Sequence, residues 1–233
     1  MNNYELSIVI PCYNEAKNIP LLITAFNSLL AINKNVEIVL VNNGSTDNTN
    51  DVLNSITQLL VNYKVVNVPV NKGYGYGILQ GLLQSSAPIL SYTHADMQCN
   101  PRDVLRALDK YNLTSNINLL IKGNRINRNK LDELFTSVMA WYVRRKLGVP
   151  LYDINAQPKL FSASFFQSIK KNIPHDFSLD LYILYQAYKK GVIETIDVTF
   201  EKRKYGEAKG GGTIKGKFKL IRRTLTYINN FGK

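Results

Sequence analysis

Short, continuous runs of apolar residues alternate with helix-like patterns through the first half of the chain. The runs lie at residues 6–11, 36–41, 64–69 and 88–93. Between the first two runs, apolar side chains recur every three or four residues from Ile19 to Leu29, as on one face of a helix. Strands that are apolar on both faces are typical of a parallel sheet covered by helices on both sides. The sequence therefore predicts an α/β fold whose strands end along one edge, where such sheets bind ligands.

The second half of the chain follows a less regular pattern. Strand-like segments lie at 119–124, 154–161 and 192–200, and helix-like segments at 130–147 and 178–190. No internal repeat or linker separates them from the first half, so we expect a single domain over residues 1–209. Residues 210–233 begin with three glycines and are predicted to form a separate amphipathic helix.

Composition excludes several classes of protein. The chain has 233 residues, 45% hydrophobic and 20% charged, which is typical of an ordered globular protein. Only Cys12 and Cys99 are cysteines, so we expect no disulfide framework and a reducing cytosolic environment. The first residues lack the basic start of a signal peptide, and no window approaches the roughly 20 apolar residues of a spanning helix.

The net charge of +12 is concentrated in two segments of the second half. Residues 122–146 carry 7 Lys and Arg against 2 Asp and Glu, and the last 33 residues carry 10 against 2. This asymmetry predicts an anionic partner for that half. Nucleic acid is disfavoured, because these segments lack a recognition motif and residues 1–121 carry 7 basic against 8 acidic residues.

Polar and glycine-rich segments follow all four strands of the first half. They are Pro11–Glu15, Asn42–Asp47, Asn71–Gly77 and His94–Gln98. Because the carboxyl ends of parallel strands lie along the same edge, their coincidence there predicts a nucleotide-binding cleft.

The segments SIVIPCYNEAKNI, VLVNNGSTDNT, NKGYGYGILQGL and THADMQCNP, in this order, resemble family 2 glycosyltransferases of the GT-A fold. The closer similarity is to the polyprenyl-phosphate mannose and glucose synthase branch. The resemblance implies an inverting transfer from a UDP- or GDP-linked sugar to a polyprenyl phosphate or a membrane-linked glycan. It also divides the domain into a nucleotide-sugar half at 1–121 and an acceptor half at 122–209.

The resemblance implies a set of donor-binding residues: Pro11, Tyr13, Asn14, Glu15, Asn43, Ser45, Asn71, Lys72, Gly73, Ala95, Gln98 and Arg203. Tyr13 offers a ring for stacking, and Glu15 accepts hydrogen bonds from the base or ribose. Asn42 and Asn43 replace a pair of aspartates that is usual in the family, which leaves the base preference open. The glycines after Lys72 would let the backbone approach the ligand closely.

The metal motif departs from the family pattern. Where the family has Asp-x-Asp, this chain has His94-Ala95-Asp96. The resemblance makes Asp96 a catalytic ligand of Mg²⁺ or Mn²⁺, and His94 either joins the metal shell or the ribose contacts, or marks a degenerate site. The degenerate alternative is a scaffold that binds nucleotide or lipid without turnover.

The acceptor side leaves a second alternative open. The resemblance places Arg125, Lys159 and Lys209 near an acceptor phosphate, which needs cations but no general base. Asp180 lies where relatives with a hydroxyl acceptor carry their general base, so a soluble hydroxyl acceptor is the alternative, with Asp180 as a catalytic residue.

The end of the chain carries one apolar helical stripe flanked by basic side chains. The stripe comprises Ile214, Phe218, Ile221, Leu225 and Ile228, and the flanking residues are Lys215, Lys217, Lys219, Arg222 and Arg223. Such a helix either lies on an anionic membrane surface or packs on the domain. We therefore expect a peripheral protein on the cytoplasmic face of the membrane, while its oligomeric state stays open.

Overall fold

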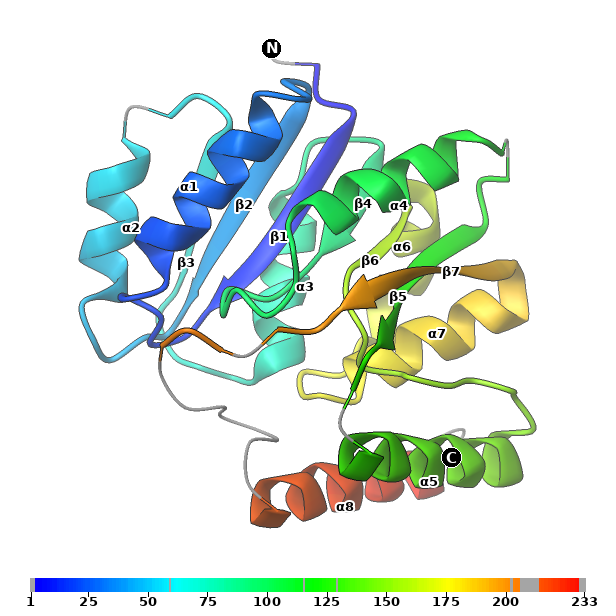
Figure 1. The fold of residues 1–233 in the computed structure, drawn as a ribbon. Helices are drawn as coiled ribbons and strands as arrows, with labels where there is room; N and C mark the ends of the chain where they lie inside the picture. Colours follow the sequence, from blue (N-terminus) through cyan, green and yellow to red (C-terminus); the bar gives the residue numbers. More distant parts are fainter. Residues whose placement is uncertain are drawn as a thin grey trace.

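The computed structural model describes residues 3–58, 60–114, 116–128, 130–201, 203–205 and 214–230, and for the residues 214, 215, 217–221 and 230 it describes the backbone only. One seven-stranded sheet with the order β3-β2-β1-β4-β6-β5-β7 forms its centre (Figure 1). The strands are β1 (Leu6–Cys12), β2 (Val36–Asn43), β3 (Tyr63–Val68), β4 (Ile89–Tyr92), β5 (Leu119–Ile126), β6 (Lys159–Ser162) and β7 (Val192–Thr199). The helices are α1 (Ile19–Leu30), α2 (Thr49–Thr57), α3 (Tyr74–Gln84), α4 (Arg102–Asn112), α5 (Lys130–Leu147), α6 (Ala163–Ile169), α7 (Leu179–Lys190) and α8 (Ile214–Asn230).

The sheet is mostly parallel. β1 pairs in parallel with β2 and β4, β2 with β3, and β5 with β7. β6 runs antiparallel to both of its neighbours, β4 and β5. All strands of the sheet except β6 therefore point the same way, and their carboxyl ends lie along one edge. The predicted α/β fold of GT-A type is confirmed.

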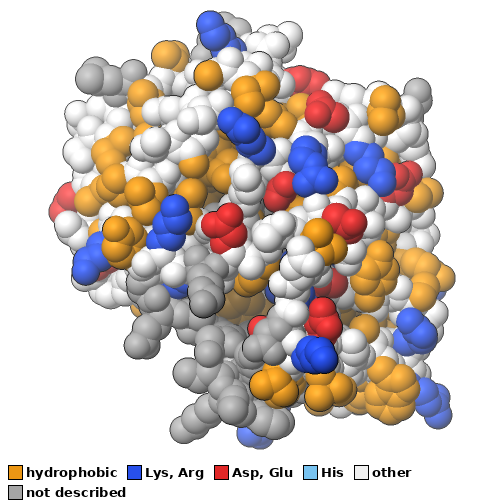
Figure 2. Space-filling model, in the orientation of Figure 1, with side chains coloured by type: hydrophobic (Ala, Val, Ile, Leu, Met, Phe, Trp, Pro, Cys, Tyr) orange, Lys and Arg blue, Asp and Glu red, His pale blue; other side chains and the backbone are white. Residues whose placement is uncertain are grey.

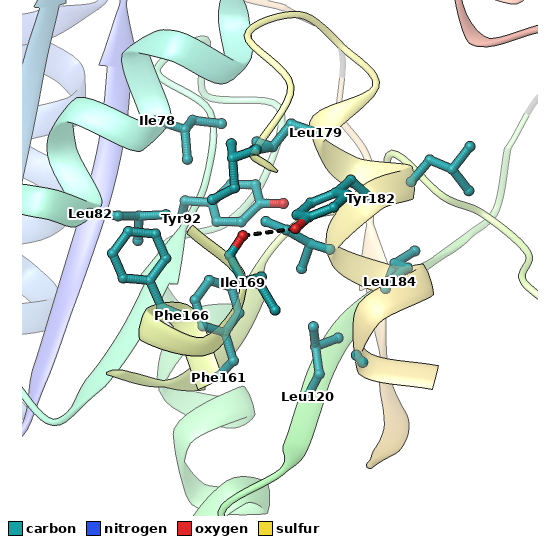
Figure 3. Packing of buried hydrophobic residues seen from close by; sticks show 14 of the residues in the cluster. Ile78, Leu82, Tyr92, Leu120, Phe161, Phe166, Ile169, Leu179, Tyr182 and Leu184 are labelled. Carbon is teal, nitrogen blue, oxygen red and sulfur yellow. Dashed lines mark hydrogen bonds between the residues drawn. The ribbon is translucent and has the colours of Figure 1, made fainter. Parts of the chain in front are cut away.

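Helices cover both faces of the sheet because successive strand residues are apolar on both sides. Ile8 and Ile38 point into a core shared with α1, α2 and α4. Val9 and Val39, one position further along, point into the other core, which holds side chains of α3, α6 and α7. Figure 3 shows part of this second core, where the Tyr182 hydroxyl donates to the Ile169 carbonyl oxygen at 2.7 Å. The apolar runs that form β1, β2 and β4 thus correspond to strands buried on both faces, whereas β3, at the edge of the sheet, is only partly buried.

Three elements differ from their predicted form. The strand predicted at 154–161 is confined to Lys159–Ser162, because residues 153–156 form a turn in which the Ala156 amide donates to the Asp153 carbonyl. Neither α4 nor α6 was predicted. The α4 side chains Val104, Ala107 and Leu108 are buried at helical spacing, so the pattern was present in the sequence.

The C-terminal helix α8 lies beside α5 (Figure 1). Its Ile228 is buried in the core, and the Tyr142 hydroxyl of α5 donates to Asn229 Oδ1 at 3.0 Å. Leu225 is partly buried, whereas Arg222 and Arg223 are exposed. This end of the predicted stripe therefore packs on the domain, and the side chains of residues 214, 218 and 221 lie outside the described part. No helix in the described part of the chain is long and apolar enough to cross a bilayer.

Candidate active site

The loops after β1 and β2 are joined at the carboxyl edge of the sheet. The Asn14 amide donates to Ser45 Oγ at 3.1 Å, and the Thr46 amide returns a hydrogen bond to Asn14 Oδ1 at 2.8 Å. The Glu15 amide donates to Thr49 Oγ1 at 2.9 Å. Asn14 adopts a φ of 55°, a left-handed conformation that asparagine tolerates better than most residues. These contacts fix Tyr13, Asn14 and Glu15 beside the Asn43 loop, as the motif order predicts.

The two asparagines after β2 have different environments. Asn42 is tied to its neighbours, since its Nδ2 donates to Asn50 Oδ1 and Asn67 Oδ1 at 3.1 and 3.2 Å. Asn43 is 3% exposed, and its Nδ2 donates to the Gly73 carbonyl oxygen at 3.0 Å. Among the described residues, Asn43 Oδ1 has no hydrogen-bond partner. A buried amide oxygen without a partner is costly, so Asn43 is the member of the pair suited to accept a ligand N–H.

A cluster of two carboxylates and one guanidinium lies at the ends of β1 and β4. Arg203 Nη2 is 2.9 Å from Asp96 Oδ2, and Arg203 Nη1 is 3.3 Å from Glu15 Oε1. Asp96 and Glu15 are both buried, so their charges depend on such contacts rather than on water. The cluster brings together three residues that are far apart in the sequence, as the donor-site prediction requires.

The backbone around Asp96 holds this cluster in place. Asp96 Oδ1 accepts from the Gln98 amide at 3.1 Å, and Met97 between them has a φ of 60°. Gln98 and Glu201 exchange two hydrogen bonds of 2.9 Å, which fasten the segment before Arg203 to the β4 loop. A methionine in the left-handed region costs on the order of 1–3 kcal/mol, a strain that clusters at functional sites.

His94 follows β4, close enough to Asp96 and Asp180 to be influenced by their charges. Its ring centroid is 6.0 Å from that of Tyr74. Burial lowers the pKa of His94, although Asp96 and Asp180 act in the opposite direction. The imidazole is therefore neutral around neutral pH and keeps a lone pair that could bind a cation or a ribose hydroxyl.

The glycines at the start of α3 allow the backbone of another loop to approach closely. A Cβ at Gly73 would lie 2.3 Å from the His175 carbonyl oxygen, and one at Gly75 would lie 2.2 Å from the Pro174 carbonyl oxygen. The Tyr76 amide donates to the His175 carbonyl at 3.0 Å. The segment that approaches these glycines is thus residues 174–176. The predicted approach of a ligand at Gly73 stays a prediction.

The predicted donor residues Asn71 and Lys72 lie beside that helix start. Both are exposed; Asn71 Oδ1 accepts from the Gly73 amide at 2.8 Å, and Lys72 Nζ is 5.1 Å from the Tyr76 ring centroid. Pro11 and Ala95 lie at the same edge, Pro11 in β1 and Ala95 after β4.

Asp180 is held in a buried network rather than exposed to an acceptor. Asp180 is 1% exposed, and its Oδ1 is 2.5 Å from Lys159 Nζ, whose side chain has no exposed surface. The Tyr92 hydroxyl and Gln157 Nε2 donate to the same oxygen at 2.8 and 3.2 Å. Burial lowers the pKa of Lys159, and the Asp180 charge opposes that shift. The predicted base and the predicted phosphate ligand are therefore partners of each other.

A pocket of about 440 Å³ opens beside α5 and the end of β5. Its lining includes Arg125, Arg128, Arg144, Trp141 and Asp153. Arg125 forms an ion pair with Asp153, with Nε 2.9 Å from Oδ1, and Arg128 Nη1 lies 3.5 Å from the same oxygen. Two arginines thus share one carboxylate. With Arg144 and Glu133, which also line the pocket, three arginines face two carboxylates, which leaves one net positive charge.

The family resemblance indicated Arg125 among these residues but gave no role to Arg128, Arg144 or Trp141. The only available signal was the basic content of residues 122–146, since helical spacing does not tell which side of α5 faces a pocket. Lys209, the third predicted phosphate ligand, lies outside the described residues.

A mostly parallel sheet with polar side chains gathered at its carboxyl edge is the architecture of α/β proteins that bind ligands at their strand ends. The chain belongs to glycosyl transferase family 2, because the sequence model of that family matches residues 7–168. The predicted membership of family 2 is confirmed by this match.

Two curated proteins that are similar to this chain carry the same name. The undecaprenyl-phosphate 4-deoxy-4-formamido-L-arabinose transferase of Proteus mirabilis (strain HI4320) is 25% identical over 212 residues, which cover 88% of this chain and 62% of the relative. The protein of the same name from Pectobacterium atrosepticum is 25% identical over 207 residues. The chain thus spans less than two thirds of the length of these relatives.

Solved structures share the fold at low sequence identity. Glucosyl-3-phosphoglycerate synthase from Mycobacterium tuberculosis, in complex with Mn²⁺, UDP and phosphoglyceric acid, superposes with a TM-score of 0.77 at 16% identity. The match covers 97% of this chain and 78% of the synthase. The same synthase with Mn²⁺, UDP-glucose and phosphoglyceric acid gives a TM-score of 0.75 at 17% identity.

Proposed function

We propose that this chain moves a sugar from a nucleoside-diphosphate sugar to a polyprenyl phosphate at the cytoplasmic surface of a membrane. The observation that carries the proposal is the arginine-lined pocket on the acceptor half of a family 2 glycosyltransferase. The curated relatives, whose name states undecaprenyl phosphate, support the same acceptor class.

On the donor side, each described group has a matching part of a nucleoside diphosphate. Asn43 Oδ1 is suited to accept from an N–H of the base, and Glu15 from ribose hydroxyls. The Arg203 guanidinium, now between Glu15 and Asp96, is suited to the oxygens of the diphosphate. Both UDP and GDP offer these groups, so the base is a matter for experiment.

The residues present fit a divalent cation that is shared with the donor. The described part of the chain contains no group of three or more His, Cys, Asp or Glu side chains that could enclose a metal ion. Asp96 and His94 would therefore supply part of the shell, and phosphate oxygens and water the rest, as is usual for Mg²⁺. When bound, Mg²⁺ or Mn²⁺ neutralises the charge that builds on the leaving diphosphate.

On the acceptor side, the arginines attract an anion that needs no general base. A phosphate oxygen of the acceptor forms a bond to the anomeric carbon while the bond from that carbon to the diphosphate breaks on the opposite face, which inverts the configuration. Arg125, Arg128 and Arg144 would orient that phosphate. The Asp180 carboxylate is buried and paired with Lys159, which argues against a hydroxyl acceptor with Asp180 as the base.

The test pairs two acceptors that differ only in the phosphate. Purified protein with Mn²⁺ and a panel of UDP- and GDP-sugars is offered a short-chain, water-soluble polyprenyl phosphate or the corresponding polyprenol. We expect transfer to the phosphate and none to the alcohol. Transfer to the alcohol would instead support the hydroxyl alternative, and donor binding without any transfer would support the non-catalytic scaffold.

Adjacent arginines provide a matched pair of variants. Both side chains are exposed, but Arg144 lines the pocket and Arg145 does not. Arg144→Gln should raise KM for the phosphate acceptor about fivefold, equivalent to roughly 1 kcal/mol of lost charge-assisted contact. Arg145→Gln should leave this KM unchanged. Equal effects of both substitutions would contradict the placement of the acceptor phosphate.

A further inference from the structure

The outer face of α5 carries a stripe of large apolar side chains that are more than half exposed. Leu131, Leu134, Val138 and Trp141 are 62%, 60%, 52% and 64% exposed. Their spacing of three, four and three residues places them along one side of the helix. We call these four residues the α5 stripe.

The fold of the domain does not require the α5 stripe. The side of α5 opposite the stripe packs on the protein, since Ala140 and Val143 are buried. Tyr142, which borders the stripe four residues after Val138, reaches Asn229 of α8. Contiguous apolar surface of this kind on a folded protein marks an interaction site rather than a packing defect. Figure 2 shows hydrophobic side chains along the lower edge of the molecule, where Figure 1 places α5.

Basic side chains flank the α5 stripe and indicate an anionic partner. Arg144, Arg145 and Lys146 are all exposed in the last turn of α5. On the neighbouring helix α8, Arg222 and Arg223 are exposed as well. An apolar helix face bordered by lysine and arginine is the arrangement by which a helix lies in the interface of a bilayer with anionic lipids.

The α5 stripe and the arginine pocket share a boundary. Trp141 belongs to the stripe and also lines the pocket, together with Ser137 and Arg144 of the same helix. A surface covering the stripe would therefore lie at the mouth of the pocket that holds Arg125 and Arg128. A lipid-borne phosphate could then enter the pocket while its hydrocarbon tail stays in the bilayer.

We propose that the α5 stripe docks this protein onto an anionic lipid surface. Leu134, Val138 and Trp141 enter the headgroup region, and Arg144, Arg145 and Lys146 contact lipid phosphates. The biological purpose of this docking rests on the function proposed above, but docking itself requires neither donor nor turnover. It assigns the membrane contact to the outer face of α5, in addition to the basic edge of α8.

Trp141 makes the contact directly observable, because it is the only tryptophan of the chain. The full chain is titrated with vesicles of phosphatidylcholine containing phosphatidylglycerol, and with vesicles of phosphatidylcholine alone. We expect a blue shift of the tryptophan emission and cosedimentation with the anionic vesicles, both reduced at high salt. An unchanged spectrum with anionic vesicles would overturn the proposal.

Variants separate the α5 stripe from general surface hydrophobicity. Val138→Glu should weaken binding to anionic vesicles at least tenfold, and Arg145→Glu about fivefold or more. Leu113→Glu is the matched control, since Leu113 is 88% exposed at the end of α4 and is not part of the α5 stripe. Equal losses for Val138→Glu and Leu113→Glu would overturn the proposal, provided circular dichroism shows all three variants folded.

Two further outcomes are decisive. A blue shift that grows with protein concentration in the absence of vesicles would mean that a second copy of the chain covers the α5 stripe, and would overturn lipid docking. Donor binding and transfer to a short-chain acceptor are measured without lipid, so they report on the proposed function alone. Sugar transfer by a protein that does not bind vesicles would overturn lipid docking and leave the proposed function intact. Vesicle binding by a protein that does not bind the donor would support lipid docking and contradict the proposed enzyme activity.

Discussion

Lys122 of β5 is a buried lysine whose protonation opposes folding. It is 2% exposed; its Nζ donates to the Gly123 carbonyl oxygen at 2.8 Å and lies 4.7 Å from the centroid of the Tyr152 ring. Burial lowers the pKa of Lys122 to about 7, against an ordinary value of 10.5, although the nearby Asp153 charge opposes the shift. The ammonium is therefore harder to form in the folded protein than in the unfolded chain.

The sign of the pH dependence follows from proton binding. Between about pH 7 and 10.5 the unfolded chain binds more protons at this lysine than the folded protein does, so the free energy of unfolding rises with pH. One proton corresponds to about 1.4 kcal/mol per pH unit, and the slope is about half of that at the lower end of the window. Lys122 should thus add about 2 kcal/mol between roughly pH 7 and pH 9.

Replacing Lys122 with methionine removes the titration while keeping an unbranched side chain. Urea denaturation of the wild type and of Lys122→Met, measured across that pH range, should show the difference in unfolding free energy changing by about 2 kcal/mol in favour of the wild type as pH rises. Lys34→Met, at an exposed position, is the control and should give no such change. If Lys122→Met and wild type vary in parallel with pH, the lysine is not desolvated and the reasoning is refuted.

Other substitutions test contacts at the carboxyl edge of the sheet. Gly75→Ala would place a Cβ 2.2 Å from the Pro174 carbonyl oxygen, so it should lower the free energy of unfolding in urea by about 2 kcal/mol or more. Gln84→Ala, at the exposed end of α3, should leave the free energy of unfolding unchanged, and a Gly75→Ala variant as stable as the wild type would show that residues 174–176 do not pack there. Arg203→Ala leaves Asp96 and Glu15 without their guanidinium partner and should weaken nucleoside-diphosphate binding, measured by calorimetry, about tenfold or more. Lys204→Ala, at the next and exposed position, should leave this affinity unchanged, and equal affinities for the two variants would show that Arg203 does not bind the nucleotide.

The sequence predicted the strands of the first half and the gathering of polar segments at one edge of the sheet, because both depend on local patterns. The apolar runs that became β1, β2 and β4 are buried on both faces, whereas the run that became the edge strand β3 is only partly buried. The motifs predicted at the ends of these strands lie at one edge. The α5 helix was also predicted with its observed bounds of 130–147. Its exposed stripe was not, because helical spacing gives a face but not the partner that the face meets.

What the sequence did not contain was the pairing of distant side chains. Lys159 and Asp180 were predicted in separate roles, as a phosphate ligand and a possible base, yet the structure pairs them in the core. Asp153 likewise turned out to hold Arg125 and Arg128 together. Such pairs depend on the antiparallel insertion of β6 between β4 and β5, which the sequence pattern of a parallel sheet does not predict.

The most direct test of the account is a calorimetric titration of UDP and GDP in the presence and absence of Mn²⁺. The wild type should bind at least one of them, with Mn²⁺ raising the affinity about tenfold or more, since the proposed cation would be shared between Asp96 and the diphosphate. Asp96→Asn should lose this enhancement, while Asp109→Asn, at an exposed position of α4, should keep it. Nucleotide binding that does not depend on Mn²⁺, or an Asp96→Asn variant that responds to Mn²⁺ like the wild type, would contradict it.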